Sequence, residues 1–343
     1  MRVRGLLRRL SLACLALVAA APLSAAVAKP LEPELAFTLG DALPNPTDDR
    51  PPTVPMRLAV SKDGDVLYVL RAGGSLETWD VSARTRTATQ EAGGLFAAAP
   101  DAGSFLTRSA TGDATITSRD GNPNALFPTS SALGALSGVG DTLALVGEFG
   151  RVDVWSLAGE PAPKTFQTAL PARNGLAVSR DGSLIAAAEG THGADEGHRT
   201  VIEVWRRGED EAFLTLDGRA TGLVLGVWNV LFSPDGSLLA ADTQKDGKSG
   251  IRVWELPGGE VRVGADGFNA YWARALAFSD DSRYAASGDE TGNVWIRDLD
   301  GGRTRHFSRA GVVQSLAFSA DGRHLAVGRW DSTVEFWRVG TSE

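Results

Sequence analysis

Cysteine is almost absent from this 343-residue chain. The one cysteine, Cys14, lies among the first 28 residues, so no disulfide can form within the chain. A chain of about 300 residues buries roughly three quarters of its unfolded surface and needs no cross-links for stability. The shortage of cysteine therefore excludes a disulfide-rich scaffold, and it excludes a cysteine nucleophile after residue 28.

Histidine is also scarce, which narrows the catalytic chemistry open to the chain. The four histidines are His192, His198, His306 and His324. A nucleophilic triad needs a serine beside a histidine that a buried acid orients, and no G-x-S-x-G motif is present to place such a serine. We interpret His306 and His324 as surface residues. We therefore expect a protein that is not an enzyme and that needs no cofactor.

The other two histidines share one polar loop. His192, Asp195, Glu196 and His198 fall within residues 189–199, and their nitrogen and oxygen atoms could in principle ligate a divalent metal. Their spacing matches no established zinc pattern, and three glycines give the loop conformational freedom. We take a solvated polar loop as the default interpretation, with a metal site as the alternative.

The apolar run at the N-terminus is too short for a membrane span. Four arginines precede apolar residues 10–23 and the A-x-A sequence Ala26-Val27-Ala28, which is the pattern of an export signal. A spanning helix needs about 20 apolar residues, so a membrane anchor is the weaker alternative. Ser11 favours general secretion over the twin-arginine route. We expect cleavage near Ala28, a periplasmic or secreted location, and no membrane insertion.

The chain has fewer basic than acidic residues. Without residues 1–28 the chain holds 30 Lys and Arg residues against 42 Asp and Glu residues, a net charge of −12. Nucleic acids and anionic lipid surfaces would repel such a chain at long range. The charge balance therefore argues against nucleic acid as a partner.

One sequence pattern recurs along most of the chain, and its clearest copy spans residues 230–256. Two short apolar runs flank Ser233-Pro234-Asp235-Gly236. In this turn proline presets φ, aspartate accepts a backbone N–H, and glycine tolerates a positive φ. After a polar gap, residues 251–254 alternate with the period of a strand. The repeated pattern therefore predicts a hairpin followed by a third strand.

The turn and the residue that closes the third strand both occur seven times. The turns begin at Ser61, Pro100, Ser137, Ser179, Ser233, Ser279 and Ser319. The third strands close on Trp79, Ser118, Trp155, Trp205, Trp254, Arg297 and Trp337. The closing residues recur about every 43 residues, which is the period of a four-stranded propeller blade.

In these repeats the chain resembles WD40-type propellers over about residues 34–337. The resemblance implies an all-β fold, a seven-bladed β-propeller of four-stranded antiparallel blades. Trp79-Asp80 is the one literal Trp-Asp pair and no Gly-His dipeptide occurs, so the chain cannot build the family's His-Ser-Asp-Trp hydrogen-bond network repeatedly. In the sixth repeat Trp295 precedes Arg297 by two residues. Both share one face of a strand, so we expect Trp295 still to pack between blades.

The last repeat stops at its third strand, so the ring needs a strand from elsewhere. Residues 34–40 resemble fourth-strand segments such as 164–170. We expect them to pair beside residues 333–337 and to remove the open edges of the ring. The expected organisation is a signal peptide (1–28), a closing strand and Pro-rich linker (29–53), WD40-like repeats (54–338) and a short tail (339–343).

The resemblance also points to a functional face. Repeats four and five carry the longest insertions, at residues 189–199 and 242–250, and in this family such loops share a face with the connections between blades. Two adjacent insertions on one face favour a functional edge. In the family, the position four residues before the aligned end of each first strand opens onto the mouth of the central channel. These positions hold Met56, Gly94, Ala132, Asn174, Trp228, Arg274 and Gln314.

Tryptophan and arginine at such a mouth are the residue types of binding hot spots. We therefore predict a partner-binding site across repeats four to six. Its residues are Trp228, Tyr271, Trp272, Arg274, Asn174 and Gln314. The alternative is that these aromatic side chains pack under their own loops.

The sequence thus favours an exported, non-catalytic interaction module that binds a protein or peptide of the cell envelope, and we expect a monomer. One alternative is a propeller enzyme of the lactonase or quinoprotein-dehydrogenase type, which would hold a metal or cofactor at the same mouth. The mouth positions include no acid, which counts against that class. A second alternative is a glycan-binding propeller, because exposed Trp and Tyr suit sugar rings.

Overall fold

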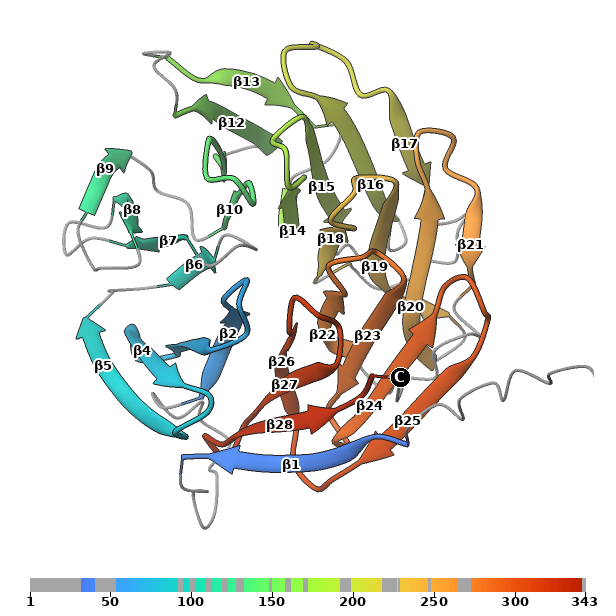
Figure 1. The fold of residues 1–343 in the computed structure, drawn as a ribbon. Helices are drawn as coiled ribbons and strands as arrows, with labels where there is room; N and C mark the ends of the chain where they lie inside the picture. The colour runs from blue at the N-terminus through green and yellow to red at the C-terminus, as the bar shows by residue number, and fades with distance from the viewer. Residues whose placement is uncertain are drawn as a thin grey trace, which may run out of the picture.

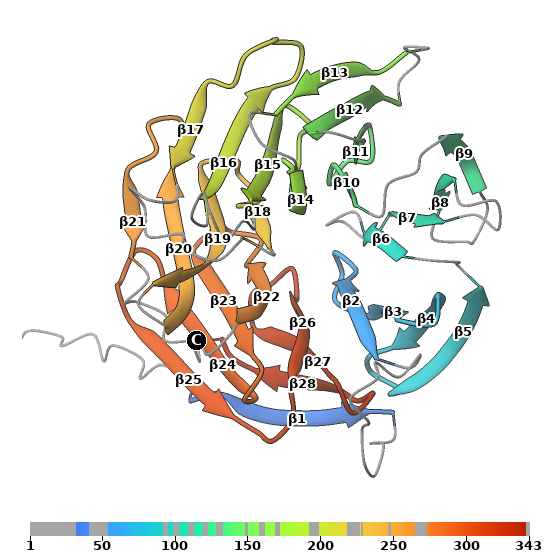
Figure 2. The same cartoon turned by 180° about the vertical axis from the view of Figure 1, so that it is seen from behind.

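Seven four-stranded antiparallel sheets stand around a central axis and form a β-propeller (Figures 1 and 2). The computed structural model describes residues 32–40, 54–91, 95–98, 103–108, 113–118, 123–127, 133–147, 150–157, 162–168, 172–191, 199–217, 227, 229–245, 248–264 and 273–340. The expected all-β, seven-bladed architecture is confirmed. The expected signal peptide and most of the Pro-rich linker lie outside the described residues.

The strands of blades 1 to 4 follow one another in chain order from the channel outward. Blade 1 comprises β2 (Pro55–Val60), β3 (Val66–Arg71), β4 (Ser75–Asp80) and β5 (Thr85–Glu91). Blade 2 comprises β6 (Leu95–Ala98), β7 (Ser104–Arg108), β8 (Ala114–Ser118) and β9 (Pro123–Phe127). Blade 3 comprises β10 (Gly134–Leu136), β11 (Thr142–Val146), β12 (Arg151–Ser156) and β13 (Lys164–Gln167). Blade 4 comprises β14 (Ala172–Val178), β15 (Leu184–Thr191), β16 (Arg199–Arg206) and β17 (Leu214–Asp217).

Blades 5 and 6 repeat this order, and blade 7 combines the two ends of the chain. Blade 5 comprises β18 (Val230–Phe232), β19 (Leu238–Lys245), β20 (Lys248–Glu255) and β21 (Val261–Val263). Blade 6 comprises β22 (Ala273–Phe278), β23 (Tyr284–Asp289), β24 (Asn293–Asp298) and β25 (Thr304–Ser308). Blade 7 comprises β26 (Val313–Phe318), β27 (His324–Arg329), β28 (Val334–Arg338) and β1 (Glu34–Leu39).

The ring closes through β1, as the sequence predicts. This strand pairs antiparallel with β28, from Glu34 opposite Arg338 to Leu39 opposite Val334, and Figure 1 shows the two strands side by side at the rim. Phe37 stacks on Phe336 of β28 with ring centroids 5.0 Å apart. The first described strand therefore completes the last blade and leaves no gap in the ring.

The repeated turn is held by its serine and aspartate side chains. In blade 5, Ser233 Oγ donates to Asp235 Oδ1 at 2.6 Å, the backbone N–H of Ser237 donates to the same oxygen, and Gly236 adopts a φ of 73°. Burial alone would raise the pKa of Asp235, but hydrogen bonds from Ser233 and Ser237 outweigh burial and hold that pKa below its ordinary value. The predicted hairpin turn is therefore confirmed, with the charged form of its carboxylate stabilised.

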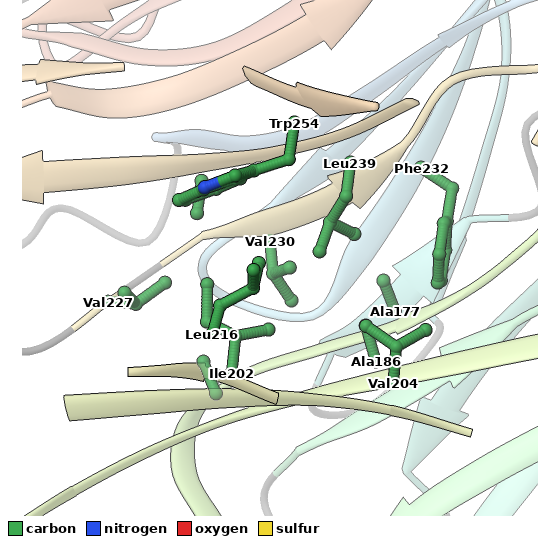
Figure 3. Close-up of a cluster of buried hydrophobic side chains, with 12 residues drawn as sticks. Ala177, Ala186, Ile202, Val204, Leu216, Val227, Val230, Phe232, Leu239 and Trp254 are labelled. Atoms are coloured by element: carbon green, nitrogen blue, oxygen red, sulfur yellow. The ribbon is translucent and has the colours of Figure 1, made fainter. Parts of the chain in front are cut away.

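The third-strand tryptophans fill the interfaces between blades. Trp254 of blade 5 is fully buried and packs with Ile202, Val204 and Leu216 of blade 4; Figure 3 shows its indole in this cluster. Trp205 and Trp337 are buried against the preceding blade in the same way. The interpretation of these positions as inter-blade core is confirmed.

The displaced tryptophan of blade 6 also reaches an interface. Trp295 is half-buried against the cluster that blades 5 and 6 share, which includes Leu238 and Val253. Its other contact is His306 of β25, whose ring stacks on the indole with centroids 4.0 Å apart. A shift of two residues along the strand keeps the same face, so the interface retains its aromatic residue.

Blades 1 and 7 contain a buried Arg-Glu-Trp cluster instead of the family's His-Ser-Asp-Trp network. The clusters consist of Arg71, Glu77 and Trp79 in blade 1 and Arg329, Glu335 and Trp337 in blade 7. Glu77 Oε2 accepts from Arg71 Nη2 at 2.7 Å and from Trp79 Nε1 at 2.9 Å. Burial alone would raise the pKa of Glu77, but Arg71 outweighs burial and holds that pKa below its ordinary value. Each cluster ties the second strand of its blade to the third.

Within the part of the chain that the structure describes, no helix has the length and apolar character needed to cross a membrane.

Candidate functional site

The inner strands of the blades surround a central channel. Among the described residues, β2, β10, β14, β18, β22 and β26 line a cavity of about 320 Å³. Most of the lining side chains are small or aliphatic, such as Ala135, Ala275 and Leu316. The polar lining residues gather at the two ends of the strands. The channel therefore has an apolar middle and two polar mouths.

The mouth at the start of the inner strands is built on β-bulges. The pairing register shifts between Pro55 and Arg57 in β2, between Ala273 and Ala275 in β22, and between Val313 and Ser315 in β26. A corresponding shift in β14 spans residues 172–175. A bulge leaves its extra residue outside the ladder and re-aims the side chain. Met56, Arg274 and Gln314 are bulged residues at mouth positions expected from the sequence, and the backbone shift in β14 includes the expected position Asn174. We call this end of the channel the bulge mouth.

Blade 2 carries a bulge as well. The register of β6 shifts between Leu95 and Ala97, so the bulge of this blade lies at Phe96. The mouth position expected in this blade, Gly94, lies outside the described residues. The pairing register of two strands decides which residue lies outside the ladder, and the sequence alone does not show that register.

Arg274 lies at the rim of the bulge mouth, where it joins an ion pair. Its Nε donates to Glu290 Oε1 at 2.6 Å, and its Nη2 contacts the same oxygen. Its backbone carbonyl accepts from Asn229 Nδ2 at 3.3 Å, and the backbone N–H of Asn229 donates to Asp242 at 2.9 Å. These bonds join the rims of blades 5 and 6, so Arg274 is held in position and still 39% exposed as a side chain.

Gln314 lies deeper in the channel. The residue is 7% exposed and lines the cavity. Its Oε1 is buried and accepts no hydrogen bond from any residue that the structure describes. A buried carbonyl oxygen without a donor is unfavourable, so this atom marks a position where a donor from a bound group would be stabilising.

The opposite mouth, at the repeated turns, is crossed by an ion pair. Arg180 in the turn of blade 4 pairs with Asp280 in the turn of blade 6. The base of the arginine side chain lies over Gly138 of blade 3, where an added Cβ would come within 2.5 Å of Arg180 Cγ. Arg180 also lines the cavity. We call this end the turn mouth.

Trp228, Tyr271 and Trp272 lie outside the described residues, as do the four candidates for a metal site, His192, Asp195, Glu196 and His198. Asn174 is described as part of β14. Among the residues that the structure describes, no group of three or more His, Cys, Asp and Glu side chains could hold a metal ion. The structure therefore brings Arg274 and Gln314 to one mouth and leaves the rest of the predicted site a prediction.

Sequence reasoning missed three polar residues that line the channel, Arg57, Arg180 and Asn229. It also missed Glu290, the ion-pair partner of Arg274. Asn229 directly follows the predicted Trp228, and Glu290 follows the second strand of blade 6. Because Asn229 is adjacent to a predicted mouth residue and Glu290 follows a strand end, the sequence could have indicated polar side chains around this mouth. Nothing in the sequence indicates that Arg180 reaches Asp280, because the two residues are a hundred positions apart.

Two comparisons with known proteins bear on the fold. A family model described as "WD domain, G-beta repeat" matches residues 303–338, which fall in blades 6 and 7. The chain is also similar to the small ribosomal subunit protein RACK1y of Oryza sativa subsp. japonica, with 28% identity over 149 residues. The aligned region covers 43% of this chain and 36% of the rice protein.

Proposed function

We propose that this WD40-like seven-bladed β-propeller is an exported, non-catalytic scaffold that binds a protein or peptide at its bulge mouth. The observation that carries the proposal is the bulge repeated in blades 1, 2, 4, 6 and 7, which leaves one residue of the inner strand, or two in blade 4, outside the ladder. Bulges next to functional sites re-aim side chains in this way. Five blades with a bulge at one mouth give a composite surface.

The chemistry of the mouth supports recognition of a polypeptide. Arg274 offers an exposed guanidinium held by Glu290. Gln314 offers a buried amide oxygen that has no donor among the described residues. Arginine is enriched at interface hot spots because its fork of N–H groups is rigid. The predicted neighbours Trp228, Tyr271 and Trp272 would add apolar area around these polar groups. The combination fits a partner that buries side chains at the mouth.

The rice relative supports a scaffold role of the same kind, since its name places it in the small ribosomal subunit, a large assembly. The acidic excess of the present chain favours a protein partner over nucleic acid. We propose a partner in the cell envelope because the N-terminal 28 residues have the features of an export signal.

The export part of the proposal has its own test. Fractionated cells of the source organism should hold the protein in the periplasm or the medium, and mass spectrometry should find Lys29 as its first residue. An unprocessed chain retained in the cytoplasm would refute export and leave the scaffold role standing.

The binding part is tested by capture. A bait of residues 29–343 should crosslink to a specific envelope protein, and a Trp228→Ala, Arg274→Ala double variant with an unchanged melting temperature should not. Equal capture by both baits would refute the bulge mouth as the site.

A further inference from the structure

We propose that the channel behind the bulge mouth binds a neutral carboxamide group, and that Gln314 is the residue that recognises it. The group would be the side chain of an asparagine or glutamine in the partner. This inference rests on the proposed function, because it names the part of a polypeptide that enters the channel.

Gln314 requires a hydrogen-bond donor at a defined place. It lines the cavity from β26, it is 7% exposed, and its Oε1 accepts no hydrogen bond from the described residues. Neighbouring Ser315 is already engaged, since its Oγ donates to the carbonyl of Pro55 at 2.6 Å. A ligand that donates to Gln314 Oε1 would remove the cost of leaving this buried oxygen unsatisfied.

The charges of the lining residues disfavour binding of a cationic group in the channel. The described lining holds three guanidinium groups, Arg57, Arg180 and Arg274, and no carboxylate. The middle of the channel is formed by aliphatic and aromatic side chains, so a lysine or arginine side chain would lose its hydration without gaining an opposite charge. A cationic group is therefore disfavoured at this position.

An anionic group is also disfavoured beside Gln314. A carboxylate has no proton to donate to Gln314 Oε1, and two of the lining arginines already pair with acids, Arg274 with Glu290 and Arg180 with Asp280. A carboxamide is neutral, and it carries a donor and an acceptor in one plane. These two atoms can pair reciprocally with the amide of Gln314.

The channel is large enough for such a group. Its volume of about 320 Å³ lies at the lower limit of small-ligand pockets, which span roughly 300–1,000 Å³. The ion pair between Arg180 and Asp280 crosses the turn mouth. A side chain of the partner would therefore enter from the bulge mouth, where the bulged residues surround it.

Four fragments of equal chain length test the proposal without knowledge of the partner: butyramide, butylammonium, butyrate and butanol. Saturation-transfer NMR on residues 29–343 should show butyramide binding about tenfold more tightly than the other three, the factor roughly expected from one net hydrogen bond. Gln314→Leu should abolish this preference. Gln90→Leu should preserve it, because Gln90 lies on β5, the outer strand of blade 1, away from the channel lining.

A second variant reverses the expected order. Gln314→Glu places a carboxylate at the same position, so butylammonium should then bind more tightly than butyramide. No binding of butyramide to the unmutated chain, or equal binding of butyramide to the Gln314→Leu variant, would overturn the proposal. So would tighter binding of butylammonium, butyrate or butanol than of butyramide to the unmutated chain. Each of these results would leave partner capture at the bulge mouth unaffected, so the failure of this inference is distinguishable from the failure of the proposed function.

Discussion

Arg180 and Asp280 form an ion pair across the turn mouth although they belong to blades 4 and 6. The turn of blade 5, which lies between them in the ring, presents the uncharged Pro234 at the corresponding position. Gly138 of blade 3 makes room for the base of the Arg180 side chain. The turn mouth is thus crossed by side chains from non-adjacent blades.

Removal of this ion pair should open the turn mouth. Ala277 of β22 lines the channel and is buried, and the chain after residue 28 has no cysteine. In an Ala277→Cys background, Asp280→Asn should increase the rate of maleimide labelling severalfold, because the arginine loses its anchor. The matched control is Asp300→Asn, which breaks the ion pair with Arg262. Equal labelling rates in the Asp280→Asn and Asp300→Asn variants would contradict a barrier at this mouth.

Loss of the closing strand should destabilise the whole ring. Leu39 is 3% exposed and packs with Val334 and Phe336 of β28, so Leu39→Ala should lower the free energy of unfolding by about 3 kcal/mol. Deletion of residues 29–40 should lower the melting temperature much further. Leu126→Ala serves as a control because Leu126 is largely exposed on β9. An unchanged thermal transition in the deletion variant would refute closure by β1.

The Arg-Glu-Trp cluster of blade 7 should be sensitive to the loss of one charge. Arg329 and Glu335 are each 1% exposed, so Glu335→Gln leaves a buried guanidinium without its counter-ion and should cost about 3–5 kcal/mol in urea unfolding. The double variant Arg329→Met, Glu335→Leu removes both charges and should cost less than this single substitution. A double variant that is less stable than the single one would contradict the idea that the unpaired buried charge causes the loss.

His324 should make stability depend on pH. Burial lowers the pKa of this imidazole below its ordinary value of 6.5, so the unfolded chain binds a proton more readily than the folded one. Stability should therefore be full above pH 6.5 and should fall as the pH drops from 6.5 through the folded pKa. His324→Gln should flatten the change in melting temperature between pH 7 and pH 5. An unchanged slope in that variant would assign the effect to other groups.

The periodic features of the fold were predictable from the sequence because they are local. The Ser-Pro-Asp-Gly turn specifies its own hydrogen bonds within five residues, as Ser233 and Asp235 show. Trp254 and its counterparts mark one position of each blade, so their spacing gave the number of blades. The strand pairing of residues 34–39 was also predictable, because a ring with one strand missing has one place for it.

The parts of the site that escaped prediction depend on register and on long-range pairing. The bulges arise from a mismatch between two paired strands, so no local pattern placed the bulge of blade 2 at Phe96. The ion pair at the turn mouth joins two remote turns, so no local pattern encodes it. The Arg-Glu-Trp clusters could have been predicted, because the same spacing occurs in blades 1 and 7. In both blades Arg precedes Glu by six residues and Glu precedes Trp by two, from Arg71 to Trp79 and from Arg329 to Trp337.

Capture of a partner at the bulge mouth is the most direct test of the account. Three baits of residues 29–343 would be crosslinked in an envelope extract of the source organism: the unmutated chain, the Trp228→Ala, Arg274→Ala variant, and an Arg180→Ala, Asp280→Ala variant altered at the turn mouth. The account predicts one specific protein captured by the first and third baits and lost with the second. Capture that survives in the second bait, or that is lost only in the third, would contradict recognition at the bulge mouth.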